Sequence, residues 1–320
     1  MSRTVRKIGL FVFLLAWVAV AIYGYHEIHG SSSGLTTITI GYQTADPVDI
    51  ARQRGDFAKK MKQKGYHVVF KKFQDGASEM QALKSGSIDY ARIGDTPPVT
   101  ALSSGTDLVY VASGSSKAKG SGILVKKGSG ITSIKDLKGK RVAYTKSTSS
   151  HFLLLNALKK AGMSSSDIKW VNLDQSAASV AFNKGKVDAW VTWDPMTATA
   201  ELDQNATLLE TGENGVSSNR DYILATKSYA ADHTDTSKLI INYLEDDMKW
   251  ANNHHTKLIT MLSKSLGLSK KVVKKMVERR TYAMGKMSTT AIKEEQEIAD
   301  TFYAEGLIKK KVTIKNHVAD

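Results

Sequence analysis

The chain has 320 residues, of which 42% are hydrophobic and 24% are charged. This balance is typical of a folded protein with one large domain or two ordinary ones, and it excludes a mainly disordered or fibrous chain. The absence of cysteine excludes disulfides, cysteine-ligated zinc, a thiol nucleophile and a lipidated N-terminal cysteine. The formal net charge of +14 indicates an anionic partner: a nucleic acid, an acidic membrane surface or a small anion.

The N-terminus combines positive charge with an apolar run. Residues 3–7 carry three basic side chains and precede an uncharged stretch from residue 8 to residue 25, which is typical of an export signal or a membrane anchor. Ala19 and Ala21 could form a cleavage site, so both alternatives stay open. In either case residues 1–25 direct the body of the protein out of the cytoplasm. Export argues against a nucleic-acid partner.

A Gly/Ser spacer at residues 30–34 is followed by short apolar runs that alternate with helical patterns. This alternation predicts an α/β protein with a parallel sheet. We expect strands near residues 37–42, 67–73, 88–93, 108–112, 123–125, 141–144, 170–173, 189–192 and 222–225. We expect helices near residues 49–64, 79–85, 100–104, 134–137, 151–161 and 176–183, and almost throughout residues 235–307.

Two stretches of the chain share one layout. Each has a strand, a helix and a strand, and then a Gly-x-x-Asp turn before a further strand, at residues 86–89 and 185–188. We interpret this as two α/β lobes, with the helical C-terminal region packed around the first lobe. Residues 1–34 then form the signal or anchor with its spacer. The first lobe comprises residues 35–120 and 225–320, and the second comprises residues 121–224.

Catalytic signatures are scarce. The sequence contains no H-E-x-x-H motif, no P-loop and no G-x-G-x-x-G motif. His254 and His255 are adjacent, so a helix would point them in different directions and they make a poor metal pair. These observations predict a protein with no catalytic residues, no metal and no cofactor.

A donor-rich turn follows the third predicted strand. Gly94, Asp95 and Thr96 precede two prolines. Glycine lets a ligand approach the backbone closely, while Asp95 or Thr96 can cap a helix whose first turn contains proline. The free N–H groups of such a helix start suit an anion. An ordinary capped helix start is the alternative.

A second donor-rich turn recurs in the other half of the chain. Ser147, Thr148 and Ser149 lie between the strand near residues 141–144 and the next helix, so hydroxyl donors join the backbone donors. Turns of this kind at the carboxyl ends of strands in two lobes indicate a ligand in the crevice between them.

Three other residues are candidates for the same crevice. Trp193 and Asp194 follow the strand near residues 189–192, where Trp193 could form an apolar wall and Asp194 could orient a donor. Arg220 precedes the strand that returns to the first lobe and could close onto an anion. A structural turn and an exposed arginine are the alternatives.

These motifs together resemble the sulfonate/taurine-type substrate-binding proteins of ABC importers. The resemblance extends from about Ile38 to Leu307. The segments that carry it are Gly86–Asp89, Gly94–Pro98, Asp107–Ala112, Ile134–Ala143, Val187–Pro195 and Gln296–Phe302.

The resemblance implies a two-lobed, type II periplasmic-binding-protein fold. Its ligand cleft would lie between the lobes, with crossover hinges near Gly120 to Ile123 and Asp221 to Ala225. It implies an extracytoplasmic, monomeric receptor that captures an aliphatic sulfonate and delivers it to an ABC permease. Relatives that take nitrate or a pyrimidine precursor leave those ligands as alternatives. A desulfinase-like enzyme or a pyrimidine synthase on the same fold is a further alternative.

The resemblance also implies which residues line the cleft. They are Gln43, Gly94, Asp95, Thr96, Ser147, Thr148, Ser149, Trp193, Asp194, Asn219 and Arg220. We expect Gln43 to donate its amide, the Ser/Thr turn to hold sulfonate oxygens and Trp193 to pack against the alkyl part. Asp95 and Asp194 either cap helices and orient donors, or they accept an ammonium group from a taurine-like zwitterion.

Overall fold

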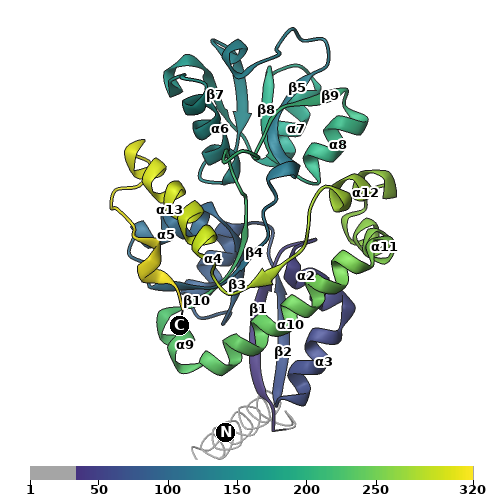
Figure 1. Ribbon diagram of the computed structural model, residues 1–320, viewed down its shortest axis with the longest axis vertical. Helices are drawn as coiled ribbons and strands as arrows, with labels where there is room; N and C mark the ends of the chain where they lie inside the picture. The colour runs from purple at the N-terminus through teal and green to yellow at the C-terminus, as the bar shows by residue number, and fades with distance from the viewer. Residues whose placement is uncertain (1–33, 320) are drawn as a thin grey trace, which may run out of the picture.

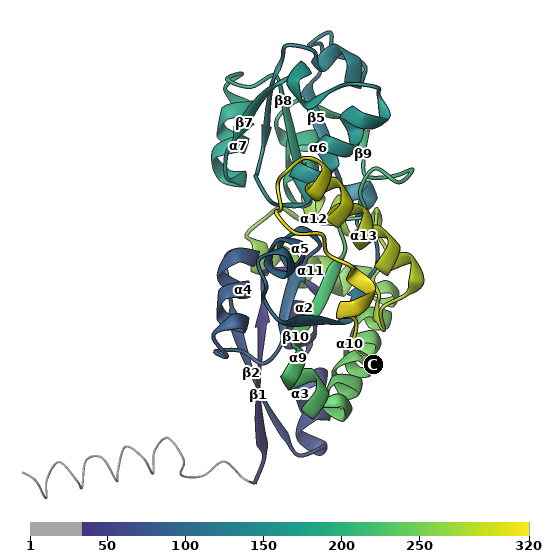
Figure 2. The ribbon, with the colours of Figure 1, turned by 90° about the vertical axis from the view of Figure 1, so that its left-hand side faces the viewer.

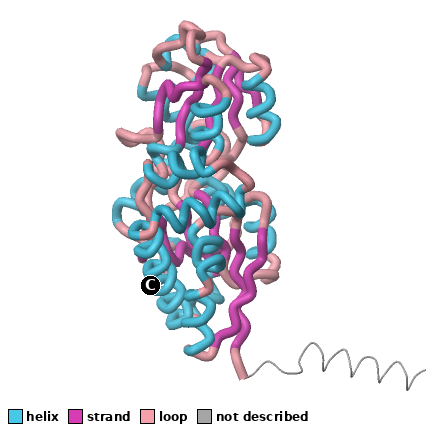
Figure 3. Tube along the Cα trace, turned by 90° about the vertical axis from the view of Figure 1, so that its right-hand side faces the viewer, coloured by secondary structure: helices cyan, strands magenta, loops and turns pink. Residues whose placement is uncertain are grey.

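Two mixed α/β lobes lie end to end in the computed structural model, which describes residues 34–319 (Figure 1). Both ends of the described chain belong to the first lobe, and the middle of the chain forms the second (Figure 2). The strands of both lobes run roughly along the long axis of the molecule (Figure 3). The two-lobed α/β architecture predicted from the sequence is confirmed.

The first lobe contains two groups of strands. A parallel pair has the order β1-β2, and a four-stranded sheet has the order β11-β4-β10-β3. The strands are β1 (Thr36–Tyr42), β2 (Tyr66–Lys72), β3 (Ala91–Gly94), β4 (Leu108–Gly114), β10 (Asp221–Thr226) and β11 (Met284–Gly285). A parallel bridge between Ile40 and Tyr90 joins the two groups. The carboxyl ends of β1 and β3 therefore lie together.

The second lobe has one five-stranded sheet with the order β7-β6-β8-β5-β9. The strands are β5 (Ser121–Lys126), β6 (Arg141–Tyr144), β7 (Lys169–Asn172), β8 (Ala189–Trp193) and β9 (Ala206–Thr211). β6 runs parallel to both of its neighbours. β9 is absent from the strands predicted from the sequence, because it is an edge strand that is mostly half-buried and shows little apolar alternation.

The prediction of a parallel sheet is wrong for β5 in the second lobe and for β10 and the two-residue β11 in the first. β5 and β10 are the first strands after the chain passes between the lobes, and each is antiparallel to both of its neighbours. A strand that enters from the other lobe begins at the carboxyl ends of the parallel strands, so it runs in the opposite direction to them.

The two crossovers occupy residues 115–120 and 212–220, between β4 and β5 and between β9 and β10. The ranges in which we expected them, Gly120 to Ile123 and Asp221 to Ala225, overlap the strands that follow each crossover. The residue limits of the lobes stay a prediction.

Helices pack around these sheets (Figure 1). Those of the first lobe are α2 (Pro47–Arg54), α3 (Asp56–Gln63), α4 (Gly76–Lys84), α5 (Thr96–Ser103), α9 (Lys227–Asp232), α10 (Thr234–Asn253), α11 (His255–Leu266), α12 (Lys270–Glu278) and α13 (Thr289–Ala304). Those of the second lobe are α6 (Ser149–Lys160), α7 (Gln175–Asn183) and α8 (Met196–Asp203). The single helix expected near residues 49–64 is two helices, because the chain breaks at Gly55, which has a φ of 80°.

The lobes share part of their apolar core. Phe152 and Leu155 of α6 belong to the same buried cluster as Ile298 and Phe302 of α13. The second lobe also has two buried clusters on its own sheet. On the α6 side, the lobe interface is thus held by hydrophobic burial as well as by polar contacts.

The predicted export signal or anchor at residues 1–25 lies outside the described residues. Within residues 34–319, no helix is both long and apolar enough to cross a membrane.

Candidate functional site

A cavity of about 140 Å³ lies between the lobes. Its walls come from the loop after β1, from β3, from both crossovers, from the end of β8 and from the region of α12. The lining residues are Gln43, Thr44, Ala45, Asp46, Arg92, Lys117, Gly120, Ser121, Trp193, Asp194, Pro195, Asn219, Asp221, Met276 and Arg280. This crevice beyond the strand ends is where open α/β sheets hold ligands.

The loop after β1 is held in one conformation by two aspartates. Asp46 caps α2 by accepting from the Asp49 N–H at 2.7 Å, and its other oxygen accepts from the Gln43 N–H at 2.7 Å. The Ala45 N–H donates to Asp49 Oδ2 at 2.9 Å. Ala45 itself has a φ of 68°, a left-handed conformation that costs energy for a residue other than glycine. The hydrogen bonds fix this loop against the cavity.

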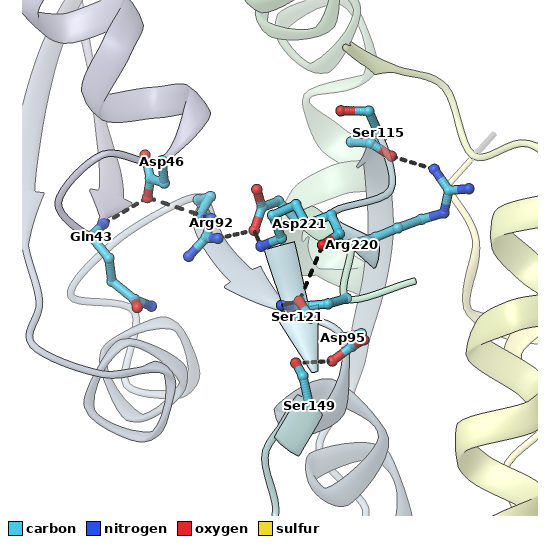
Figure 4. Close-up of polar contacts among 12 residues, drawn as sticks. Gln43, Asp46, Arg92, Asp95, Ser115, Ser121, Ser149, Arg220 and Asp221 are labelled. Carbon is cyan, nitrogen blue, oxygen red and sulfur yellow. Dashed lines mark hydrogen bonds and ion pairs between the residues drawn. The ribbon is translucent and has the colours of Figure 1, made fainter. Parts of the chain in front are cut away.

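A cluster of cations surrounds Asp221 at the first residue of β10. Arg92 pairs with its carboxylate, Lys117 Nζ lies 2.5 Å from Oδ1, and Arg280 Nη2 lies 3.9 Å from Oδ2. Figure 4 shows the continuous chain of contacts from Gln43 through Asp46 and Arg92 to Asp221. These side chains are nearly buried, so water screens their charges weakly.

Two guanidinium atoms in this cluster have no hydrogen-bond partner. Arg92 Nε and Arg280 Nε are both buried and unsatisfied. Arg92 Nε lies 3.5 Å from Asp46 Oδ2, which qualifies as an ion pair but not as a hydrogen bond. A buried donor without a partner carries a free-energy cost that a ligand oxygen could remove.

Burial shifts the pKa of two groups at the cavity. Burial raises the pKa of Asp46 to about 6, although the nearby charge of Arg92 opposes the rise. Burial also holds the pKa of Lys117 well below its usual range, and the charges of Arg92 and Arg280 lower it further. Both shifts reflect the cost of burying a charge, which the nearby opposite charges do not offset.

Trp193 and Asp194 lie at the cavity as predicted from the sequence, but the Asp194 carboxylate is already engaged. Arg279 Nε donates to Asp194 Oδ2 at 2.7 Å, and Thr197 Oγ1 donates to Oδ1 at 2.6 Å. Arg279 also donates to Glu201 at 2.7 Å. Arg279 follows α12 of the first lobe, so Asp194 acts mainly as a link between the lobes.

Asn219 ties the two crossovers together at the cavity wall. It has a φ of 45°, and its Nδ2 donates to Ser121 Oγ at 2.8 Å. Ser121 Oγ in turn donates to the backbone oxygen of Lys117. One donor of the Asn219 amide is thereby used by the protein itself.

The first predicted anion turn lies at the lobe interface but outside the cavity lining. Asp95 is buried at the start of α5 and accepts from Thr96 Oγ1 at 3.0 Å. Ser149 Oγ, from the second lobe, donates to the same Asp95 oxygen at 2.5 Å (Figure 4). A Cβ added to Gly94 would come 3.9 Å from Ser149 Oγ, so this turn packs against α6. Burial raises the pKa of Asp95, and the hydrogen bond from Ser149 opposes the rise.

The second predicted anion turn is also satisfied by the protein. The Ser147 N–H donates to His151 Nδ1 at 3.3 Å, and Thr148 Oγ1 donates to the Thr145 backbone oxygen at 2.7 Å. His151 is packed against aromatic rings, and burial lowers its pKa to about 4. Neither Ser147 nor Thr148 lines the cavity.

Arg220 points away from the cavity. Its Nε donates to Glu294 Oε2 at 2.5 Å, and its Nη1 donates to the Gly114 backbone oxygen at 2.7 Å. With Asp95, it borders a separate, smaller cavity of about 40 Å³. The structure therefore brings four predicted site residues to the main cavity, namely Gln43, Trp193, Asp194 and Asn219. The other predicted residues lie elsewhere on or near the lobe interface.

Sequence reasoning missed every charged residue of the cavity except Asp194. The others that line it are Asp46, Arg92, Lys117, Asp221 and Arg280. One signal was available: Arg92 stands between the apolar residues Ala91 and Ile93 in a short strand, and a charged residue in a buried strand is rarely left without a partner.

Comparisons with known proteins agree with the two-lobed fold. The chain matches the family model described as NMT1/THI5 like over residues 47–257. It is similar to the crystal structure of the periplasmic aliphatic sulphonate binding protein SsuA from Escherichia coli, with a TM-score of 0.84 and 30% identity, covering 89% of this chain and 92% of that one. It is also similar to the alkanesulfonate-binding protein SsuA from Xanthomonas axonopodis pv. citri bound to MOPS, with a TM-score of 0.81 and 31% identity, covering 90% and 99% of the two chains. The taurine-binding periplasmic protein of Escherichia coli (strain K12) is 32% identical over 167 residues, which are 52% of this chain and 51% of that protein.

Proposed function

The chain belongs to the NMT1/THI5-like family, and we propose that it is an extracytoplasmic solute-binding protein for an aliphatic sulfonate. In this proposal it captures the sulfonate between its lobes and delivers it to an ABC permease. The similar proteins of known structure are named for aliphatic sulphonate or alkanesulfonate binding, which supports this ligand class. The protein acts as a monomer, and residues 1–25 export it or anchor it at the membrane.

The observation that carries the proposal is the pair of unsatisfied guanidinium donors in the cavity. Arg92 Nε and Arg280 Nε are buried without hydrogen-bond partners, and Lys117 adds a third cation. A sulfonate has one negative charge and three acceptor oxygens, so it can accept from several donors at once. Its charge would also favour the protonated form of Lys117, whose pKa is held low by burial and by the two arginines.

The other side of the cavity suits an alkyl chain. Trp193, Pro195 and Met276 all line it, and Met276 is almost completely buried. An indole face and a flexible thioether provide apolar surface that adapts to chains of different length. We propose that the sulfonate group lies toward Arg92 and Arg280 and that the alkyl part lies toward Trp193.

Polar links across the lobe interface would stabilise the closed, ligand-bound form. Asp194 and Glu201 of the second lobe bind Arg279 of the first, and Ser149 of the second lobe binds Asp95 of the first. The two crossovers are the only chain connections between the lobes within residues 34–319. We propose that the lobes open and close about these crossovers.

We propose that binding occurs without catalysis. The one serine hydroxyl at the cavity, that of Ser121, is held by Lys117 and Asn219 rather than by a general base. A nucleophile activated by an adjacent base would be needed for covalent chemistry. The proposed role requires reversible one-to-one binding and no turnover.

Calorimetric titration with a panel of ligands tests the proposal. The panel contains ethanesulfonate, butanesulfonate, taurine, nitrate, sulfate and a hydroxymethylpyrimidine. We expect one-to-one binding of at least one alkanesulfonate and no heat from nitrate or sulfate. Binding of the pyrimidine alone would overturn the ligand class, and consumption of a bound sulfonate would overturn the non-catalytic role.

A further inference from the structure

Glu79 of α4 is a buried carboxylate that touches the cavity only through other residues. It is completely buried and does not line the cavity. Its Oε2 accepts from Gln43 Nε2 at 2.9 Å, and its Oε1 accepts from the Arg92 backbone N–H at 2.7 Å. One side chain therefore holds two separate segments of the binding site, the loop after β1 and strand β3.

The neighbouring strand leaves room for this carboxylate. A Cβ placed on Gly41 of β1 would come 2.7 Å from Glu79 Oε1 and 2.8 Å from Ile88 Cδ1. Any side chain at this position would push Glu79 away from Arg92 and Gln43. The close approach is an independent sign that the position of Glu79 is fixed by the fold.

The hydrogen bond from Gln43 fixes the orientation of its amide. An amide has a donor end and an acceptor end on opposite sides of one planar group. Because one N–H of Nε2 donates to Glu79, only the second N–H of that nitrogen remains beside the acceptor Oε1 for a ligand in the cavity. An acceptor facing a sulfonate, which has only acceptor oxygens, is unfavourable. A protonated Glu79 would reverse this arrangement, because its O–H could donate to Gln43 Oε1 and leave Nε2 for the ligand.

Burial and the neighbouring charges bring the pKa of Glu79 into the pH range of a binding experiment. Burial raises its pKa to about 8, opposed by the hydrogen bond from Gln43 and by the charge of Arg92, while the charge of Asp46 adds to the rise. β10 contributes Asp221, whose charge is balanced by Arg92 and its neighbours. The facing helix α5 carries no charged residue.

We propose that Glu79 is a positioning residue whose protonation decides which end of the Gln43 amide is presented to the bound sulfonate. This inference rests on the proposed function. A sulfonate binds better when Glu79 is protonated, so its affinity falls as the pH rises through the range in which Glu79 loses its proton. Binding above that range also takes up a proton from solution.

The test compares wild type with Glu79→Gln, titrated with ethanesulfonate at pH 7 and pH 9. The sulfonate keeps its charge over this range, so any change belongs to the protein. We expect wild-type affinity to fall roughly five- to tenfold, the loss of about one hydrogen bond to a charged group. In Glu79→Gln, the new amide can donate to Gln43 Oε1 and accept from the Arg92 N–H at both pH values. Lys117 also loses its proton more readily than usual and weakens binding at high pH in both proteins. The affinity of Glu79→Gln should therefore match that of wild type at pH 7 and fall at least about fivefold less than that of wild type between pH 7 and pH 9.

Two further variants make the result specific. Glu294→Gln also removes a carboxylate at the lobe interface, but one that pairs with Arg220 outside the main cavity, so it should keep the wild-type pH dependence. Gln43→Ala removes the amide itself and should lose the part of the pH dependence that Glu79 causes, which provides the test if Glu79→Gln does not fold.

The outcomes separate the two proposals. An equal pH dependence in wild type, Glu79→Gln and Gln43→Ala, or none in wild type, would overturn the role of Glu79 while leaving sulfonate binding intact. If wild type bound none of the sulfonates at either pH, the proposed function itself would fail. Proton uptake, measured by repeating the titration in buffers of different ionisation enthalpy, should appear in wild type at pH 9 and disappear in Glu79→Gln.

Discussion

At the α6 end of the lobe interface, Ser149 of one lobe donates to the buried Asp95 of the other. At the cavity between the lobes, Arg92 and Arg280 pair with Asp221 of their own lobe, and each keeps one buried donor without a partner. Both regions hold polar groups at the ends of strands and at the starts of helices. They differ in whether the protein supplies the matching acceptor itself.

That difference separates a structural contact from a binding site. The Ser/Thr turn at residues 147–149 has the hydroxyl donors expected of an anion site, yet that of Ser149 donates to Asp95 and that of Thr148 donates to a nearby backbone oxygen. In the cation cluster around Asp221, Arg92 Nε and Arg280 Nε have no hydrogen-bond partner. Donor type alone is therefore a weak guide to a ligand site, and unsatisfied donors are a stronger one.

Removal of a cavity arginine should have the largest effect. Arg280→Met keeps much of the side-chain volume but removes a charged donor from the site, so we expect sulfonate affinity to fall by roughly a hundredfold, about 2.7 kcal/mol. Arg220→Met is the matched control, because Arg220 is also nearly buried and paired with a carboxylate, yet it lies outside the main cavity. We expect less than a threefold loss for the control by calorimetry. Similar losses in both variants would show that the cavity is not the anion site.

Replacement of the aromatic wall should alter the preference for chain length. Trp193→Ala removes apolar surface next to the proposed alkyl position, so hexanesulfonate should lose roughly tenfold in affinity while methanesulfonate changes little. Competition titrations with the two ligands give the ratio directly. An equal loss for both chain lengths would place the alkyl group elsewhere.

Loss of the Ser149 hydroxyl should have a smaller effect on sulfonate binding. Ser149→Ala leaves Asp95 with fewer hydrogen bonds at the interface, so we expect a roughly threefold weaker affinity, caused by a less stable closed form. Small-angle X-ray scattering of the ligand-saturated variant should show a larger open fraction than wild type. A loss as large as that of Arg280→Met would restore the Ser/Thr turn as a direct ligand site.

The smallest expected effect is the change in unfolding free energy with pH that the buried carboxylates cause. Burial raises the pKa of Glu79 to about 8 and that of Asp46 to about 6. The native state then binds more protons than the unfolded state above the usual carboxyl pKa of about 4. These groups stabilise the fold at lower pH, and their contribution is lost as the pH rises toward 8.

Urea unfolding at pH 5.5, 7 and 8.5 measures this contribution. The low pKa of Lys117 acts with the opposite sign, so the informative quantity is the difference between wild type and Glu79→Gln. We expect the unfolding free energy of wild type to fall more steeply with pH, by up to about 1.4 kcal/mol per pH unit. Parallel curves for the two proteins would mean that Glu79 does not titrate in this range.

The architecture could be predicted from the sequence because its signals are local. Apolar runs, glycine turns and helix caps mark most strands and helices along the chain. The direction of β5 and β10 could not be found in this way, because it depends on which lobe each strand enters from.

The site residues that could be predicted are likewise those with local signals. Gln43 and Trp193 follow predicted strands directly, and their place at the strand ends could be inferred from their position.

The cation cluster could not be predicted, because it is assembled from distant parts of the chain. Arg92 lies in a short strand, and its partner Asp221 begins a strand that returns from the other lobe. Arg280 reaches the cavity only because α12 packs against α8 of the second lobe. The apolar neighbours of Arg92 indicate that it needs a partner, but nothing within a few residues of it identifies that partner. The Ser/Thr turn shows the converse, since the sequence cannot reveal that Ser149 already has an acceptor in the remote Asp95.

A crystal structure of the protein with 2-bromoethanesulfonate would test the central claim most directly. Anomalous scattering from bromine locates the alkyl end of the ligand, and the density of the sulfonate locates its charged end. The account predicts the sulfonate oxygens within hydrogen-bond distance of Arg92 and Arg280, with bromine beside Trp193. A sulfonate bound at residues 147–149, with both arginines unchanged, would contradict it.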